Sequence, residues 1–164
     1  MPNRSPRSRL RAFQAIHGGA PAPDFLADLH FLENRDLDLS VRLGALLAFN
    51  ALMVTIGTHP VSASPGAPLS LDAARQPWET LASLAGILPF LTAAVLALWA
   101  MLVGEEFETE GEEDADVLRQ RLMAAYVRSI AAQSRLLRWS VYATLAGGVL
   151  TAGVWGWILL NKML

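Results

Sequence analysis

The chain contains no cysteine, which excludes disulfides, thiolate metal sites and cysteine nucleophiles. It also has a single lysine, Lys162, so that arginine supplies nearly all of its positive charge. Charged residues make up only 17% of the 164 residues, and hydrophobic residues make up 53%. This balance is poorer in charge than that of an ordinary soluble domain and predicts one small membrane domain. The arginine bias, with abundant Ala, Gly and Pro, favours a bacterial source.

Charge is absent from three long runs. Residues 80–104 include no charged side chain, and a helix of that length exceeds the roughly 30 Å hydrocarbon core of a bilayer. Residues 139–161 form a second such run, whereas the run at 43–58 is shorter than the ideal span of about 20 residues. That shorter run is either a full crossing or a buried or re-entrant helix. We therefore predict spans at about 40–58, 80–103 and 138–160.

A charged segment at 24–39 precedes the first run. Its hydrophobic residues give it one apolar side: Phe25, Leu26, Leu29, Phe31 and Leu32. This pattern predicts an N-terminal amphipathic helix, which either lies on the membrane surface or packs against another cytoplasmic helix. Its five acidic residues favour packing over binding to anionic lipid.

Residues 117–138 carry a second charged helical pattern. Arginines recur every seven residues, at Arg121, Arg128 and Arg135. Apolar residues form a stripe interrupted by Ser134: Met123, Val127, Ile130 and Leu137. No helix breaker separates this segment from the last apolar run, so we predict one long helix over about 117–160, half of it cytoplasmic.

The predicted fold class is therefore all-α: an integral membrane protein with three transmembrane helices, the third continuous with a long cytoplasmic helix, plus the N-terminal amphipathic helix. Residues 1–23, with four arginines and no acid, are predicted to be a disordered basic tail, and 24–164 to be the helical membrane domain. The tail also resembles a mitochondrial transit peptide, which stays open as an alternative.

The arginine distribution predicts the topology. Six arginines lie in residues 1–42 and five in 105–138, against one basic residue in the 59–79 loop and one after the last run. Because positive residues mark the cytoplasmic side, the N-terminus is predicted to be cytoplasmic and the C-terminus periplasmic, in a bacterial inner membrane.

Residues able to support catalysis do not converge in this sequence. The three histidines, His17, His30 and His59, fall on the tail, a cytoplasmic helix and a loop, and no nucleophile, phosphate-loop or dinucleotide motif occurs. We predict a protein that is not an enzyme, with no cofactor and no nucleic-acid partner. The acidic segment 105–116 is predicted to be a solvated linker. The alternative is a metal site built from Glu105, Glu106, Glu108 and Glu110.

The three apolar runs at 43–58, 80–104 and 139–161 contain no Asp, Glu, Lys, Arg or His, which disfavours ion-coupled transport. Asn50, near the centre of the first run, is predicted to make an interhelical hydrogen bond. Small residues recur every four positions in the last run: Ser140, Thr144, Gly148, Ala152 and Gly156. Such a ridge permits close helix packing, either within the chain or between copies. Three spans bury little surface alone, so a homo-oligomer or a larger membrane complex is expected.

The repeated arginines at positions 121, 128 and 135 admit three interpretations. They can bind the acidic segment of the same or a neighbouring chain, or an anionic ligand such as a nucleotide phosphate. They can also form a solvated basic face, which is common on exposed helices.

The segment VRLGALLAFNALMVTIG, preceded by an amphipathic helix and followed later by an arginine-bearing helix that enters the last span, resembles the membrane domain of Pycsar effector proteins. The likeness covers about residue 25 to the end and is sharpest in LLAFNAL. It implies a bacterial antiphage effector that responds to a cyclic pyrimidine nucleotide by damaging the inner membrane, with any nucleotide site on the cytoplasmic helices. The alternatives are a small accessory or scaffold subunit of a membrane complex, or a membrane-anchored signalling adaptor.

Overall fold

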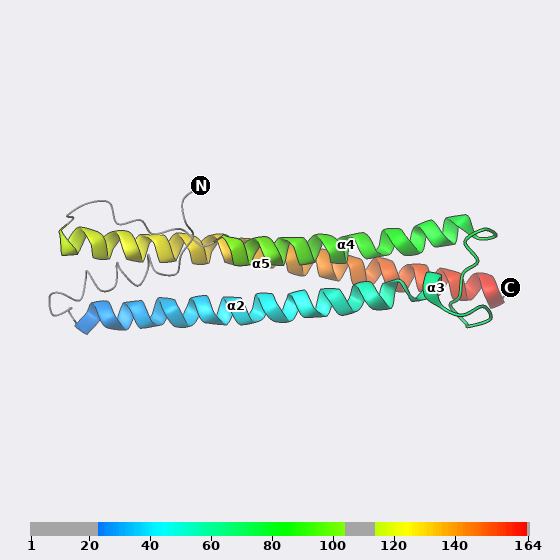
Figure 1. Cartoon of the computed structure of the whole chain (residues 1–164), viewed down its shortest axis with the longest axis horizontal. Helices are drawn as coiled ribbons and strands as arrows, with labels where there is room; N and C mark the ends of the chain where they lie inside the picture. Colours follow the sequence, from blue (N-terminus) through cyan, green and yellow to red (C-terminus); the bar gives the residue numbers. More distant parts are fainter. Residues whose placement is uncertain (1–22, 104–113, 164) are drawn as a thin grey trace. The chain divides into compact units, whose positions relative to one another are not determined.

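The computed structural model describes residues 23–103 and 114–163. Within these ranges the secondary structure is helical, with no strand (Figure 1). The helices are α2 (Pro23–Gly57), α3 (His59–Ser62), α4 (Pro77–Leu102) and α5 (Ala115–Met163). Three of them, α2, α4 and α5, are long and apolar enough to cross a membrane. The prediction of an all-α protein with three long apolar helices is therefore confirmed.

The long helices extend beyond the apolar runs. Helix α2 has 35 residues and joins the predicted segments 24–39 and 40–58 without a break. Neither proline nor glycine occurs between Pro23 and Gly44, so nothing in that stretch favours ending the helix. Helix α5 has 49 residues and is likewise one element. The tail, apart from its last residue Pro23, lies outside the described residues.

The chain divides into two compact units. The first unit consists of Met1–Val41 and Met101–Ser134, and the second of Arg42–Ala100 and Arg135–Leu164. Helices α2 and α5 contribute residues to both units, and nearly all of α4 belongs to the second.

The first unit has a small apolar core where α2 meets α5. Its buried residues are Leu29, Leu118, Leu122 and Ala125, with Phe25 and Tyr126 packed beside them. Of the stripe that we predicted on α5, Met123 and Ile130 are partly buried, Val127 is 54% exposed, and Leu137 belongs to the second unit. The buried positions instead include two polar residues, Ser129 and Gln133. Because neighbouring residues are about 100° apart around a helix, the stripe from Met123 lies beside the buried face that includes Leu122, and it misses the buried polar residues.

In the second unit, α2, α4 and α5 pack against one another at successive levels along their length. Its core begins with Leu43 of α2, Ala97 and Ala100 of α4, and the partly buried Leu47, Leu136 and Leu137. Further along, Asn50 of α2 contacts Thr144 of α5, and Thr151 of α5 contacts Gly86 of α4. Residue numbers rise together in α2 and α5 and fall in α4. In this unit α2 and α5 are therefore parallel, and α4 runs antiparallel to both.

Helix α2 ends earlier than the two helices beside it. An added Cβ at Gly57, its last residue, would lie 3.1 Å from Ile87 Cγ1. Helix α4 extends ten residues beyond Ile87 to its start at Pro77, a distance of about 15 Å. The first apolar run is short, and α2, which contains it, accordingly ends beside the middle part of α4.

The α2–α4 connection, residues 58–76, continues from that point. It contains the short helix α3, whose Pro60 is buried, and the Leu71 N–H donates to the Pro60 carbonyl oxygen at 2.8 Å. Lys162 Nζ, near the end of α5, donates to the carbonyl oxygen of Ser70. The first of these hydrogen bonds closes the connection on itself, and the second holds it to α5.

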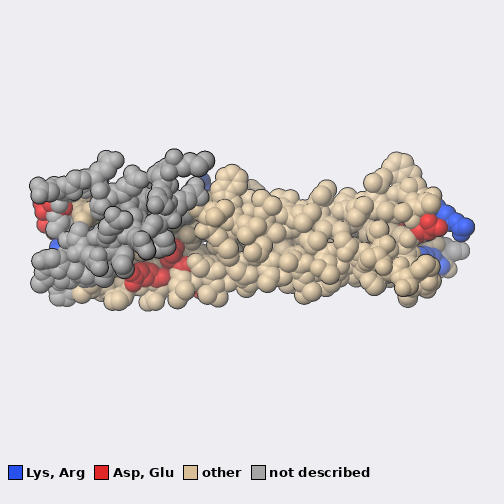
Figure 2. Space-filling model, in the orientation of Figure 1, with Lys and Arg blue, Asp and Glu red and all other residues tan. Residues whose placement is uncertain are grey.

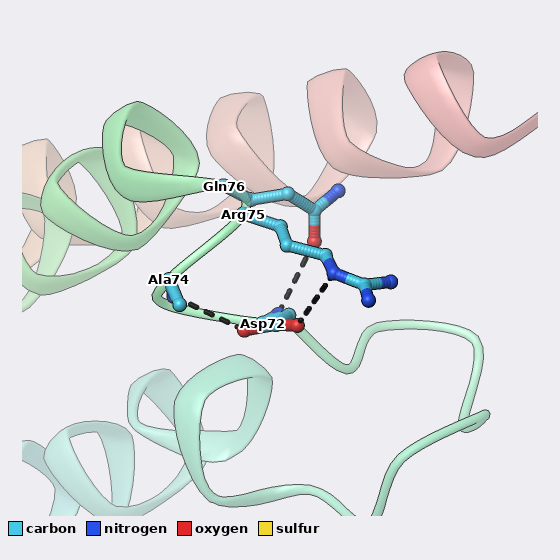
Figure 3. Close-up of polar contacts among 4 residues, drawn as sticks. All are labelled: Asp72, Ala74, Arg75 and Gln76. Atoms are coloured by element: carbon cyan, nitrogen blue, oxygen red, sulfur yellow. Dashed lines mark hydrogen bonds and ion pairs between the residues drawn. The ribbon is translucent and has the colours of Figure 1, made fainter.

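A tight turn leads the connection into α4 (Figure 3). Asp72 Oδ1 accepts the Ala74 N–H at 3.0 Å, and Arg75 Nε lies 3.5 Å from Asp72 Oδ2. The Gln76 side-chain oxygen accepts the Asp72 N–H at 3.2 Å. An aspartate whose carboxylate accepts a backbone N–H two residues later is a common turn former, and here it sets the direction in which α4 begins.

Candidate helix contacts and basic surface

The most buried polar group of the second unit connects all three helices. Asn50 and Ser140 are fully buried and Thr144 is 8% exposed. Thr144 Oγ1 lies 2.9 Å from Asn50 Oδ1, and Ser140 Oγ donates to the Ala93 carbonyl oxygen at 2.7 Å. Asn50 therefore makes the interhelical hydrogen bond that its place in an apolar run predicts. Its amide Nδ2 donates to the Leu46 carbonyl oxygen at 2.8 Å, which holds the side chain in place.

The Thr144 hydroxyl has two acceptors and one proton. The carbonyl oxygen of Ser140 also lies 2.9 Å from Thr144 Oγ1. Because a hydroxyl carries only one proton, the Asn50 oxygen and this carbonyl share or compete for it. The hydrogen bond from Thr144 to Asn50 of α2 therefore competes with a hydrogen bond from Thr144 to Ser140 within α5.

The predicted ridge of small residues divides into two parts. Ser140 and Thr144 lie inside the helix contact, whereas Ala152 and Gly156 are exposed. A Cβ added at Gly148 or Gly156 would meet no atom within 4 Å. A spacing of four residues advances about 40° around the helix at every step, so a ridge of five residues leaves any one contact face. Among the described residues, an added Cβ at Gly148 or Gly156 thus finds no packing partner, and contact of residues 148, 152 and 156 with another copy stays a prediction.

The positions that do make close contact are the neighbours of that ridge. An added Cβ at Gly147 would lie 3.0 Å from three ring carbons of Phe90, which is 1% exposed. Thr151 Oγ1 donates to the Gly86 carbonyl oxygen at 3.2 Å. The buried α5 positions in this part of the helix are spaced by four, three, four and seven residues, and they are 140, 144, 147, 151 and 158.

The Thr151 hydrogen bond lies near the proline of α4. Pro89 has no N–H, so the carbonyl of Ala85 loses its usual partner within the helix, and the proline ring also disturbs the turn before it. Gly86, the next residue, presents its carbonyl oxygen to Thr151. Neighbouring helices commonly supply donors to such a turn in membrane proteins, and the absence of a side chain at Gly86 lets α5 approach closely.

The first unit also contains a polar contact, which the sequence did not indicate. Gln133 Nε2 lies 3.3 Å from Asp36 Oδ1 of α2 and 3.3 Å from Ser129 Oγ. Ser129 Oγ donates to the Val103 carbonyl oxygen, just after α4, at 3.2 Å. Polar residues on a charged helix look solvent-facing in a sequence, and only their partners in other helices reveal that they are buried.

The arginines that repeat every seven residues do not form an enclosed site. Arg121, Arg128 and Arg135 are all exposed. Arg119 of the first unit is instead partly buried. Its Nη1 lies 3.1 Å from Asp116 Oδ1, and its guanidinium carbon lies 5.6 Å from the centre of the Phe25 ring. The i,i+3 spacing of Asp116 and Arg119 is the sequence signal for this pair.

Metal ligands were predicted only as an alternative, in the acidic segment. Glu105, Glu106, Glu108 and Glu110 lie outside the described residues. Among the residues that the structure does describe, no three His, Cys, Asp or Glu side chains are grouped so that they could hold a metal ion.

Many large apolar side chains of the second unit face outward. In the most hydrophobic stretches of α2, α4 and α5, only 17%, 33% and 22% of the residues are buried. On the face drawn in Figure 2, a long stretch of surface carries no acidic or basic residue. Large exposed hydrophobic side chains include Phe49, Leu52, Leu88, Val95, Leu98, Leu145, Val149 and Leu160. A surface of this kind suits lipid tails and is costly in water.

The fold and these contacts define a helical, membrane-embedded protein whose buried polar groups connect its own helices. No known family, curated protein or solved structure matches the chain.

Proposed function

We propose that the chain is a non-enzymatic protein of a bacterial inner membrane that acts by assembling with further copies or with a larger complex. One observation carries the proposal: the second unit uses its buried polar groups to hold its own helices together and leaves its apolar faces outward. Asn50, Ser140, Thr144 and Thr151 all point inward in this way. Groups engaged in helix contacts are poorly placed to bind a substrate.

The proposed orientation places the N-terminus and the first unit in the cytoplasm and the C-terminus in the periplasm. The support is the arginine distribution, with eleven of the thirteen basic residues in 1–42 and 105–138. In this orientation the N-terminal part of α5 is the cytoplasmic helix that continues the third span. Its exposed arginines, Arg121 and Arg128, then face the compartment that holds nucleotides and protein partners.

The particular form of the proposal is a membrane-disrupting antiphage effector controlled through the first unit. Its support is the likeness of residues 41–57 to the membrane domain of Pycsar effector proteins. The implied signal is a cyclic pyrimidine nucleotide, whose phosphate would be bound by arginines. The alternative is an accessory or scaffold subunit, or a signalling adaptor, and the exposed basic residues of α5 favour the adaptor among these because they can dock an acidic partner.

Induced expression in bacteria with a membrane-potential dye tests the effector. We expect depolarisation when a cyclase that makes cyclic pyrimidine nucleotides is co-expressed, and little without it. Arg128→Glu, which reverses one charge on an exposed position, is expected to reduce that response, while Arg75→Glu in the α2–α4 connection should leave it unchanged. A membrane potential that never changes, with the protein present in the membrane, contradicts the effector and leaves the subunit or adaptor.

A further inference from the structure

Four residues at the start of the last apolar run lie on one face of α5. They are Arg135, Arg138, Trp139 and Tyr142, at positions i, i+3, i+4 and i+7, which are neighbours on a helix surface. All four are exposed, with Trp139 at 58% and Tyr142 at 61%. The two rings meet edge to face, with their centres 6.2 Å apart and their planes at 79°. The face therefore places two cations directly beside two ordered aromatic rings.

No acidic side chain among the described residues pairs with the two arginines of this face. Within residues 23–103 and 114–163, neither Arg135 nor Arg138 forms an ion pair, whereas Arg35, Arg75 and Arg119 each lie beside an aspartate. Beyond Arg138 the next charged residue in the sequence is Lys162. The positive charge thus lies at the boundary of a long apolar stretch.

We propose that this face binds the headgroup of an anionic phospholipid. The guanidinium forks of Arg135 and Arg138 match the geometry of a phosphate, to which they can each donate two hydrogen bonds. Trp139 and Tyr142 place an apolar ring and a polar N–H or O–H at the depth where headgroup and acyl chain meet, which is where these residues gather in membrane proteins. The positive charge of the two arginines and the interfacial depth of the two aromatic rings both favour a lipid phosphate as the ligand.

The same face continues as an apolar track, which distinguishes a lipid from a free phosphate. Leu145 and Val149 follow Tyr142 at helical spacing and are 62% and 74% exposed. An acyl chain can lie along them while its phosphate contacts the arginines. This inference rests on the membrane placement in the proposed function, but it is independent of whether the protein is an effector, a subunit or an adaptor.

The test is a lipid titration of the purified full chain in an uncharged detergent, followed by native mass spectrometry. We expect phosphatidylglycerol to bind more tightly than phosphatidylcholine of the same chain length. Arg135→Gln/Arg138→Gln should weaken phosphatidylglycerol binding about 30-fold, or about five-fold for each arginine, and leave phosphatidylcholine unchanged. Trp139→Ala should weaken binding of both lipids, because it removes the ring that contacts them.

Arg35→Gln/Arg75→Gln is the matched control, since it removes the same charge from two arginines that already lie beside aspartates. Equal weakening in the control and in the test variant overturns the site, as does the absence of a phosphatidylglycerol preference in the parent. Inorganic phosphate is added as a competitor: displacement of the lipid at similar concentrations shows a free-anion site and also overturns the proposal. Because the substituted residues are exposed, the helical content by circular dichroism should match that of the parent. Membrane insertion of each variant, checked separately, distinguishes failure of this site from failure of the membrane assignment.

Discussion

Two adjacent glycines of α5 show how sharply surroundings differ from one residue to the next. Gly147 faces the ring of Phe90, and Gly148 faces no atom of the described chain within 4 Å. Both are equally small in the sequence, and the regular four-residue spacing pointed to Gly148. Asn50, in contrast, was identifiable because it is the one strongly polar side chain near the middle of an apolar run, where a hydrogen bond is nearly obligatory. The hydrogen bond of Asn50 could be predicted from the sequence. Which of the two glycines lies against Phe90 could not.

We predict that Gly147→Ala is less stable than Gly148→Ala by about 1 to 3 kcal/mol, the usual cost of overpacking. The new methyl group would press on Phe90, which is too buried to move aside. Both changes gain the same helix propensity, so the difference between them isolates packing. Thermal unfolding in detergent, followed by circular dichroism, measures it. Equal midpoints for the two variants would place Gly147 away from α4.

At the scale of elements, α5 was predictable as a helix but its buried face was not. The sequence contains no proline from Ala115 to Met163, and the helix runs through. In the first unit, however, the buried side includes Ser129 and Gln133, whose hydrogen bonds reach Val103 and Asp36. Buried polar residues on a helix weaken the apolar periodicity from which a face is assigned. Contacts with residues far away in the sequence determine which face of α5 is buried. A single sequence does not show these contacts.

We predict that Leu122→Ala lowers the stability of the protein by about 2 to 5 kcal/mol, because Leu122 is 4% exposed and the substitution leaves a cavity. Val127→Ala, at a position 54% exposed, should change it by less than about 0.5 kcal/mol. The measurement is the free energy of unfolding of the full chain in detergent. If Val127→Ala proves the more damaging change, the apolar stripe read from the sequence is the true contact face.

At the scale of the whole molecule, length and hydropathy were sufficient to predict three long apolar helices. They could not predict that α2 would be one 35-residue helix, since the acidic segment 24–39 and the apolar run after it look like separate elements. Nor could they predict that α2 would stop beside the middle part of α4. The orientation in a membrane depends on charge outside the spans, so it is a property of the chain and bilayer together.

We predict that alkaline phosphatase fused after Leu164 is active and that phosphatase fused within 105–116 is inactive. The enzyme works only in the periplasm, and arginine-rich segments stay in the cytoplasm. Fusion activities in whole bacteria, normalised to the amount of each fusion, give the answer. The reverse pattern would invert the proposed topology, and two active fusions would mean that α5, which lies between the two fusion points, does not cross.

The early end of α2 has a consequence for the lipid around it. In the proposed membrane placement, the bilayer beside Leu43 would meet three helices, whereas beyond Gly57 it would meet α4, α5 and the α2–α4 connection. Hydrocarbon cannot satisfy the N–H and C=O groups of such a connection, and those without a protein partner need water. Water and headgroups would therefore be drawn inward by up to about 15 Å on this side of the protein, the length of α4 beyond Ile87. The leaflet next to the connection should be thinner than the leaflet elsewhere, so this protein would deform a bilayer even at rest.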